Sequence, residues 1–149
     1  VRKLQMDKSE EEKEADLQSI PDPVKRQARK ETMEKGIEAP IVMNSLKKAG
    51  EFLDQLEANI EDSGWIAGDK FSMADACTLP YILRLDHLAL SEAFSKEKRP
   101  KINNWYKEVR DLDFFDKAVT SQIPPPLVEM MNTFGEEVKE KALNLMEEK

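Results

Sequence analysis

The stretch GDKFSMADACTLPYILRL, residues 68–85, decides the fold, because it starts a helix with a complete set of local signals. Ser72 and Asp75 are spaced as a capping box, in which the hydroxyl accepts from the N–H of Asp75 and the carboxylate accepts from the N–H of Ser72. Such a cap stabilises a helix by about 1 kcal/mol. Pro80 lies inside this helix, removes a backbone hydrogen bond to Ala76 and bends the helix at a cost of about 3 kcal/mol. A capped, bent helix with an apolar face is typical of the centre of a helical bundle.

The remaining sequence also predicts helices, since apolar residues recur at three- and four-residue steps and no run alternates as a strand would. Ser9 and Glu12 can cap a first helix, although residues 1–20 hold few apolar positions and form either a frayed end or one that has lost its neighbour. We expect further helices over about 23–35, 40–60, 72–88, 100–112 and, after the triple proline, 127–145. The inward positions of the last helix would be Leu127, Met130, Met131, Phe134, Val138, Ala142 and Leu145. We predict one all-α domain over residues 1–149, a bundle of five to seven helices.

Composition and charge exclude several classes of function. The chain has 30 acidic and 23 basic residues, a formal net charge of −7, so it offers no basic field for nucleic acid or an anionic membrane. One cysteine and one histidine cannot build a disulfide framework or a structural zinc site. No apolar run approaches the roughly 18 residues that span a bilayer. We therefore expect a soluble, cytoplasmic protein with no metal ligands.

Five short motifs carry a resemblance to a known family. Trp65-Ile-Ala-Gly68 is a turn, Phe71-Ser-Met-Ala-Asp75 opens the central helix, Pro80 lies within it, and Arg99-Pro-Lys-Ile102 precedes Trp105-Tyr106 on the next helix. In this order and spacing, over roughly residues 37–120, the chain resembles the C-terminal domain of glutathione S-transferases. Residues 52–57 and Lys98-Arg-Pro100 are similar to the branch of glutathione-dependent dehalogenases, ether-cleaving enzymes and ganglioside-induced differentiation-associated proteins.

The resemblance implies that glutathione chemistry belongs to a separate thioredoxin-like domain placed before this one. No βαβ pattern is present in the chain, so we expect no catalytic and no cofactor-binding residue here, and we assign glutathione to the parent protein. The resemblance gives Ser72 and Asp75 a structural role. It also implies a homodimer and a hydrophobic electrophile as co-substrate.

Several residues invite a functional interpretation that a structural one outweighs. Cys77, near a helix N-terminus, could be a low-pKa nucleophile, but it lacks an obvious base, so we favour a small core residue. His87 follows Asp86, yet adjacent helix positions do not face each other, so we favour a helix-end histidine satisfied by backbone or solvent. Tyr81 and the Trp105–Tyr106 pair could stack on a ligand, but their helical spacing favours the core and its edge.

Methionine adapts to irregular ligands, although core packing is its usual role. In the resembling family, the first helices and the C-terminal segment of this domain border the co-substrate pocket. Met6, Met33 and Met43 are therefore our candidates for contact with a hydrophobic substrate.

Two functional hypotheses follow. The first is the helical, co-substrate-side half of a glutathione transferase, inactive without its thioredoxin-like domain. The alternative is a non-catalytic interaction module, since similar domains serve assembly in elongation-factor and synthetase complexes. Glutathione-dependent activity of the parent protein would separate the two, so whether the parent is an enzyme stays open at this point.

Overall fold

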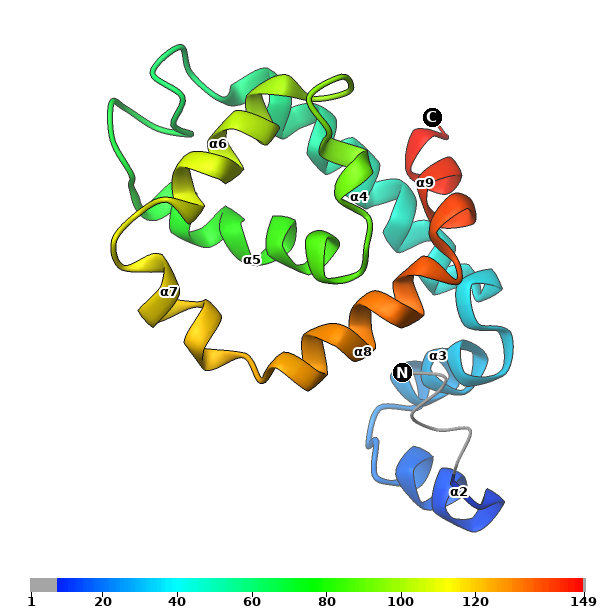
Figure 1. Cartoon of the computed structure of the whole chain (residues 1–149). Coiled ribbons are helices and arrows are strands. Elements are labelled where there is room, and N and C mark those ends of the chain that lie inside the picture. Colours follow the sequence, from blue (N-terminus) through cyan, green and yellow to red (C-terminus); the bar gives the residue numbers. More distant parts are fainter. Residues whose placement is uncertain (1–7, 149) are drawn as a thin grey trace. The chain divides into compact units, whose positions relative to one another are not determined.

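The computed structural model describes residues 8–148, and every regular element within that range is helical (Figure 1). The all-α prediction is confirmed. The chain divides into two compact units, residues 1–47 and 48–149, which are described separately below. The single domain over 1–149 stays a prediction.

The first unit consists of α2 (Glu10–Gln18), α3 (Pro23–Lys35), η1 (Gly36–Glu38) and the start of α4 (Pro40–Asn59). Ser9 and Glu12 form a capping box at α2, with the Ser9 N–H 2.8 Å from the Glu12 carboxylate. The Asp22 carboxylate caps α3 through the Val24 N–H at 2.8 Å. α2 packs against α3, and Leu17 is buried in this unit.

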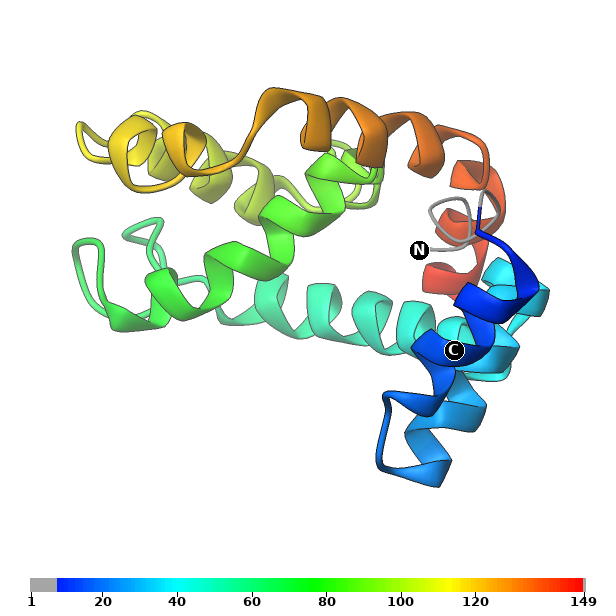
Figure 2. The ribbon, with the colours of Figure 1, turned by 90° about the horizontal axis from the view of Figure 1, so that it is seen from below.

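The second unit contains the remainder of α4 and all later elements. These are α5 (Met73–His87), η2 (Ser91–Phe94), α6 (Pro100–Arg110), α7 (Phe115–Ala118), η3 (Thr120–Gln122), α8 (Pro125–Glu136) and α9 (Lys139–Glu147). α5 runs through the middle of the unit and packs against α8 (Figures 1 and 2). The largest fully buried side chains are Trp105, Phe94, Leu53, Ile82, Ile102, Val109 and Asp75.

Two glycines of the second unit allow backbones to touch. A methyl group on Gly50 of α4 would lie 1.8 Å from the Met146 carbonyl oxygen of α9. A methyl group on Gly135 of α8 would lie 1.8 Å from the carbonyl oxygen of Leu88, directly after α5. Because real Cβ atoms never approach so closely, these two positions fix where α9 and α8 dock.

The prediction of one long C-terminal helix is wrong. The helix breaks at Glu137 and Val138 into α8 and α9, which run in different directions and dock at the two glycine contacts described above (Figure 1). The break changes the inward face: Ala142 and Leu145 are buried, but Leu127 and Val138 are exposed. α8 also begins at Pro125, inside the proline run, because the first helical positions need no N–H donor. The residues from 8 to 148 therefore hold eight α-helices, one more than the upper limit expected.

Candidate functional site

The carboxylate of Asp75 is the polar centre of the second unit. It is fully buried and accepts four hydrogen bonds. One oxygen accepts from the Ser72 N–H at 2.8 Å and from the Ser72 hydroxyl at 2.7 Å. The other oxygen accepts from the Ile66 N–H at 3.1 Å and from the indole N–H of Trp105 at 2.8 Å. The capping box thus also ties the turn before α5 and the helix α6 to the start of α5.

Two opposing effects set the pKa of Asp75. Burial by itself raises the pKa, because it disfavours the charged form. The hydrogen bonds from Ser72, Trp105 and Ile66 outweigh burial, so the pKa lies below its ordinary value. Asp75 is therefore ionised at neutral pH and has no spare proton for acid catalysis, which fits a structural role.

Two further carboxylates, both on α4, hold α6 in place. Glu57 accepts from the backbone N–H groups of Lys101 and Ile102 at 3.0 and 2.9 Å, and so caps the N-terminus of α6. Asp54 accepts from two nitrogens of Arg99 at 2.7 and 3.2 Å, and Arg99 also donates to the Ala93 carbonyl. In the sequence, residues 52–57 and 98–100 are notable only for their resemblance to one branch of a family. The contacts of Asp54, Glu57 and Arg99 show that both segments help to hold α6 in place.

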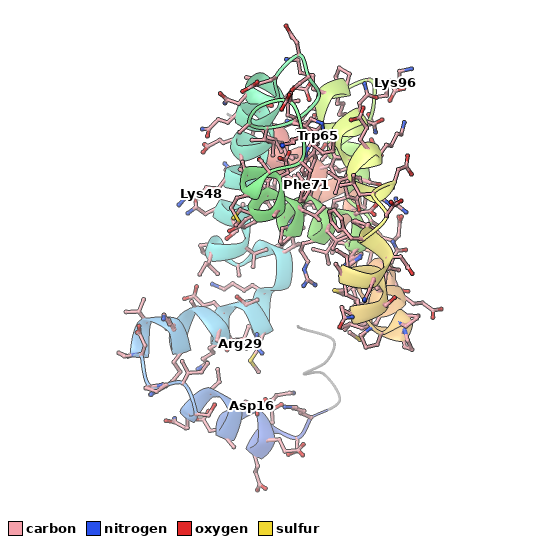
Figure 3. All side chains as sticks on the ribbon, turned by 90° about the vertical axis from the view of Figure 1, so that its left-hand side faces the viewer. Asp16, Arg29, Lys48, Trp65, Phe71 and Lys96 are labelled. Atoms are coloured by element: carbon pink, nitrogen blue, oxygen red, sulfur yellow. The ribbon has the colours of Figure 1, made fainter. Side chains whose placement is uncertain are left out.

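Aromatic side chains close the turn that precedes α5. Trp65 and Phe71 lie next to each other in the second unit (Figure 3), with ring centroids 5.9 Å apart in an edge-to-face arrangement. Phe71 also contacts Phe114, at 5.2 Å. Such pairs contribute about 0.5–1.5 kcal/mol beyond the area they bury. Trp65 and Phe114 therefore both stabilise the position of Phe71 at the end of the turn.

One face of α5 is exposed and largely apolar. Met73 is 77% exposed and Tyr81 is 65% exposed. Between them Ala76, Cys77 and Pro80 are exposed at steps of three and four residues, which places all five on one helix face. Tyr81 packs its ring on Phe52 of α4 at 5.7 Å. Because surfaces of soluble proteins rarely gather apolar side chains in this way, the exposed α5 face is our candidate functional surface.

The structure overturns the prediction that Cys77 is a core residue. Cys77 is exposed on the α5 face, not buried in the core, because α5 turns Leu79, Ile82 and Leu85 inward instead. Within residues 8–148, no titratable side chain hydrogen-bonds to Cys77.

The other aromatic candidates and the histidine differ in how deeply they are buried. Trp105 and Tyr106 are buried as predicted, whereas Tyr81 is exposed, so its predicted place in the core or at the core edge is wrong. His87 is the last residue of α5 and half-buried, and burial lowers its pKa while the charge of Asp86 opposes that shift. The side chains of Asp86 and His87 line one cavity, an arrangement that their adjacent positions did not suggest.

The burial of two of the three methionine candidates is described. Met33 on α3 and Met43 on α4 are half-buried, and neither lines the cavity described below. Met6 lies outside the described residues. Substrate contact by these methionines stays a prediction.

Two general features hold within residues 8–148. No helix there is both long enough and apolar enough to cross a membrane. No group of three or more histidine, cysteine or acidic side chains in that range is arranged to hold a metal ion.

Comparison with known proteins identifies the family. The family model "Glutathione S-transferase, C-terminal domain" matches residues 8–113, a range that contains Ser72, Asp75 and Trp105. The chain is 34% identical over 53 residues to Glutathione S-transferase TCHQD from Arabidopsis thaliana, and the match covers 36% of this chain and 20% of that relative. The chain therefore spans only a fifth of that relative's length. No solved structure shows a significant match. By its family match and its all-helical fold, the chain belongs to the family of glutathione S-transferase C-terminal domains.

Proposed function

We propose that this chain is the helical, co-substrate-side half of a glutathione S-transferase-like protein, which conjugates or transfers glutathione to a hydrophobic electrophile. In this proposal a thioredoxin-like domain binds glutathione and stabilises its thiolate. The helical half supplies an apolar wall that holds the electrophile near the sulfur. Within the cytoplasm the full protein would act as a homodimer.

The exposed α5 face is the observation that carries the proposal. Its five side chains from Met73 to Tyr81 leave apolar area in water, and burying such area stabilises an interface by about 25 cal/mol per Å². We propose that the thioredoxin-like domain covers this face. The chain alone would then lack both the thiolate and the second wall of the site, so we expect it to be inactive.

The test starts from the native protein, purified from its source and characterised by intact mass and N-terminal sequence. We expect a thioredoxin-like domain in it, and we expect glutathione-dependent conjugation of chlorodinitrobenzene by the native protein but not by the chain of residues 1–149. Light scattering should show a homodimer of the native protein. A native protein that holds the extra domain but conjugates no electrophile would contradict the transferase proposal.

A pair of matched variants tests the role of the exposed α5 face. Tyr81→Asp places a charge on the face, whereas Leu127→Asp places the same charge on an exposed apolar position of α8. We expect the first change to loosen the thioredoxin-like domain, measured as faster limited proteolysis between the domains and lower activity. Equal effects of the two changes would count against this face as the contact.

The same face also supports a second candidate function, a non-catalytic module that binds another protein. This alternative expects a stable complex with a protein partner and no glutathione-dependent activity in the native protein. The conjugation assay therefore separates the two candidates.

A further inference from the structure

A cavity of about 580 Å³ lies in the second unit, among α5, α6, α7, η3 and α8. Its apolar wall consists mainly of Leu83, Phe115, Val119, Ile123 and Val128. Its volume falls within the roughly 300–1,000 Å³ that small-molecule sites occupy. None of the α5 side chains on the exposed face from Met73 to Tyr81 lines it, so the cavity is separate from the surface assigned above.

The polar end of the cavity is built around Asp86. The Tyr106 hydroxyl donates to one carboxylate oxygen of Asp86 at 2.8 Å. The second oxygen receives no hydrogen bond within the described chain. Asp86 is half-buried and lines the cavity, so we assign this oxygen as the acceptor for a ligand bound there. Burial is the main cause that raises the pKa of Tyr106, and the hydrogen bond to Asp86 and the charge of Asp86 raise it further. The phenol therefore keeps its proton and donates it to the Asp86 carboxylate in a hydrogen bond.

The other titratable groups of the cavity add one more carboxylate and one cation. Glu129 of α8 is exposed at the rim. The Arg110 guanidinium lies over the Tyr106 ring, 5.5 Å from its centroid. Burial lowers the pKa of His87, so its imidazole adds little positive charge at neutral pH. Two carboxylates against one guanidinium give the lining a net negative charge.

We propose that this cavity binds a small amphipathic amine, whose apolar body packs on the wall from Leu83 to Val128 and whose cationic nitrogen donates to the second oxygen of Asp86. An ammonium supplies the donors that this oxygen lacks, and it complements the net charge of the lining. An anion would meet the same two carboxylates. The apolar wall supplies most of the affinity, and Asp86 selects the head group.

The experiment compares three probes with the same apolar body on the full chain of residues 1–149: naphthylethylamine, naphthylethanol and naphthylacetate. Binding is followed by chemical-shift changes of backbone amides and by calorimetry. We expect saturable binding of the amine, with shifts at the C-terminal end of α5 and in the N-terminal part of α8, and about tenfold weaker binding of the alcohol. Stronger binding of the acid than of the amine, equal binding of all three, or no saturation at millimolar concentration would overturn the proposal.

Charge variants test the head-group contact. Asp86→Asn should weaken binding of the amine about tenfold and binding of the alcohol by much less, because the alcohol carries no charge. Asp116→Asn on α7 makes the same change of charge at an exposed position outside the cavity lining and should leave both unchanged. Arg110→Gln should leave amine binding equal or stronger, since it removes a like charge. A loss of amine affinity in Arg110→Gln would overturn the assignment.

A cavity-filling variant keeps the test valid if Asp86→Asn fails to fold. Thr120 is exposed on η3 and lines the cavity, so we expect the indole of Thr120→Trp to fill part of the cavity without changing its charge. We expect this variant to abolish binding of both amine and alcohol. Unchanged amine binding in Thr120→Trp would place the amine elsewhere and overturn the proposal.

Discussion

Replacing Asp75 by asparagine tests whether the buried carboxylate organises the second unit. The two side chains have nearly the same shape, but asparagine offers one acceptor oxygen where four donors converge, two on each oxygen of Asp75. Whichever way the amide turns, its NH₂ group faces two donors. The Ser72 hydroxyl can rotate to accept instead, but the backbone N–H of Ser72 cannot.

The magnitude follows from the donors that lose their acceptor. With the amide nitrogen on the Ser72 side, the partly buried Ser72 N–H loses its partner and the Ile66 and Trp105 bonds lose a charged acceptor. Each such loss costs about 1–3 kcal/mol, so we expect Asp75→Asn to lower the free energy of unfolding by about 3 kcal/mol or more. Asp69→Asn, at an exposed position in the preceding turn, is the matched control and should change it by less than about 0.5 kcal/mol.

Urea unfolding followed by tryptophan fluorescence is the assay. Both tryptophans, Trp65 and Trp105, lie in the second unit, so the signal reports on that unit alone. The midpoint and slope together give the free energy of unfolding.

Unfolding at acid pH provides an independent check, because the direction in which the free energy of unfolding changes follows from the pKa of Asp75. The folded pKa of Asp75 is lower than its unfolded value, so the carboxylate stabilises the fold above the unfolded value of about 3.9. That stabilisation is lost as the pH falls from there through the folded pKa. The difference in unfolding free energy between the native chain and Asp75→Asn should therefore shrink below about pH 4. A variant as stable as the native chain at pH 7, or a difference that stays constant into acid, would refute the reasoning.

Three further predictions concern single positions of the second unit. Gly135→Ala should lower the free energy of unfolding by at least about 2 kcal/mol, because its methyl group collides with the Leu88 carbonyl; a stability unchanged in urea melts would contradict the contact. Glu57→Gln should cost about 1–2 kcal/mol in the same melts, since one N–H of α6 loses its acceptor, while Glu51→Gln on the exposed side of α4 should cost almost nothing. Cys77 should react with a maleimide in the folded chain nearly as fast as in urea, and slow labelling would show that it is covered.

The helix boundaries near each cap could be predicted from the sequence because they depend on residues within one turn of each other. The capping boxes at Ser9 and Ser72 and the proline-led start of α3 all lie where local spacing places them. The break between α8 and α9 could not be predicted in this way. Its apolar positions continue at helical spacing, and only the close approach of Gly135 to Leu88 shows where the helix must turn away.

The candidate surface was missed for a related reason. Cys77 and Tyr81 share a helix with Leu79 and Ile82, and every one of these residues is apolar or nearly so. Over residues 76–83 the helix is apolar on nearly all sides, so the sequence does not reveal which side faces the core, and the exposed face became visible only once α5 had neighbours.

The sequence alone determined the all-α class, the box of Ser72 and Asp75, and the family resemblance, because these depend on short-range spacing along one chain. The tertiary structure decided which groups meet across long separations. It brought the Trp105 indole to Asp75, the Glu57 carboxylate to the start of α6, and Tyr106 to Asp86 at the edge of a cavity. Each of these pairs joins residues at least 20 positions apart, and their meeting depends on how whole helices pack rather than on any local preference.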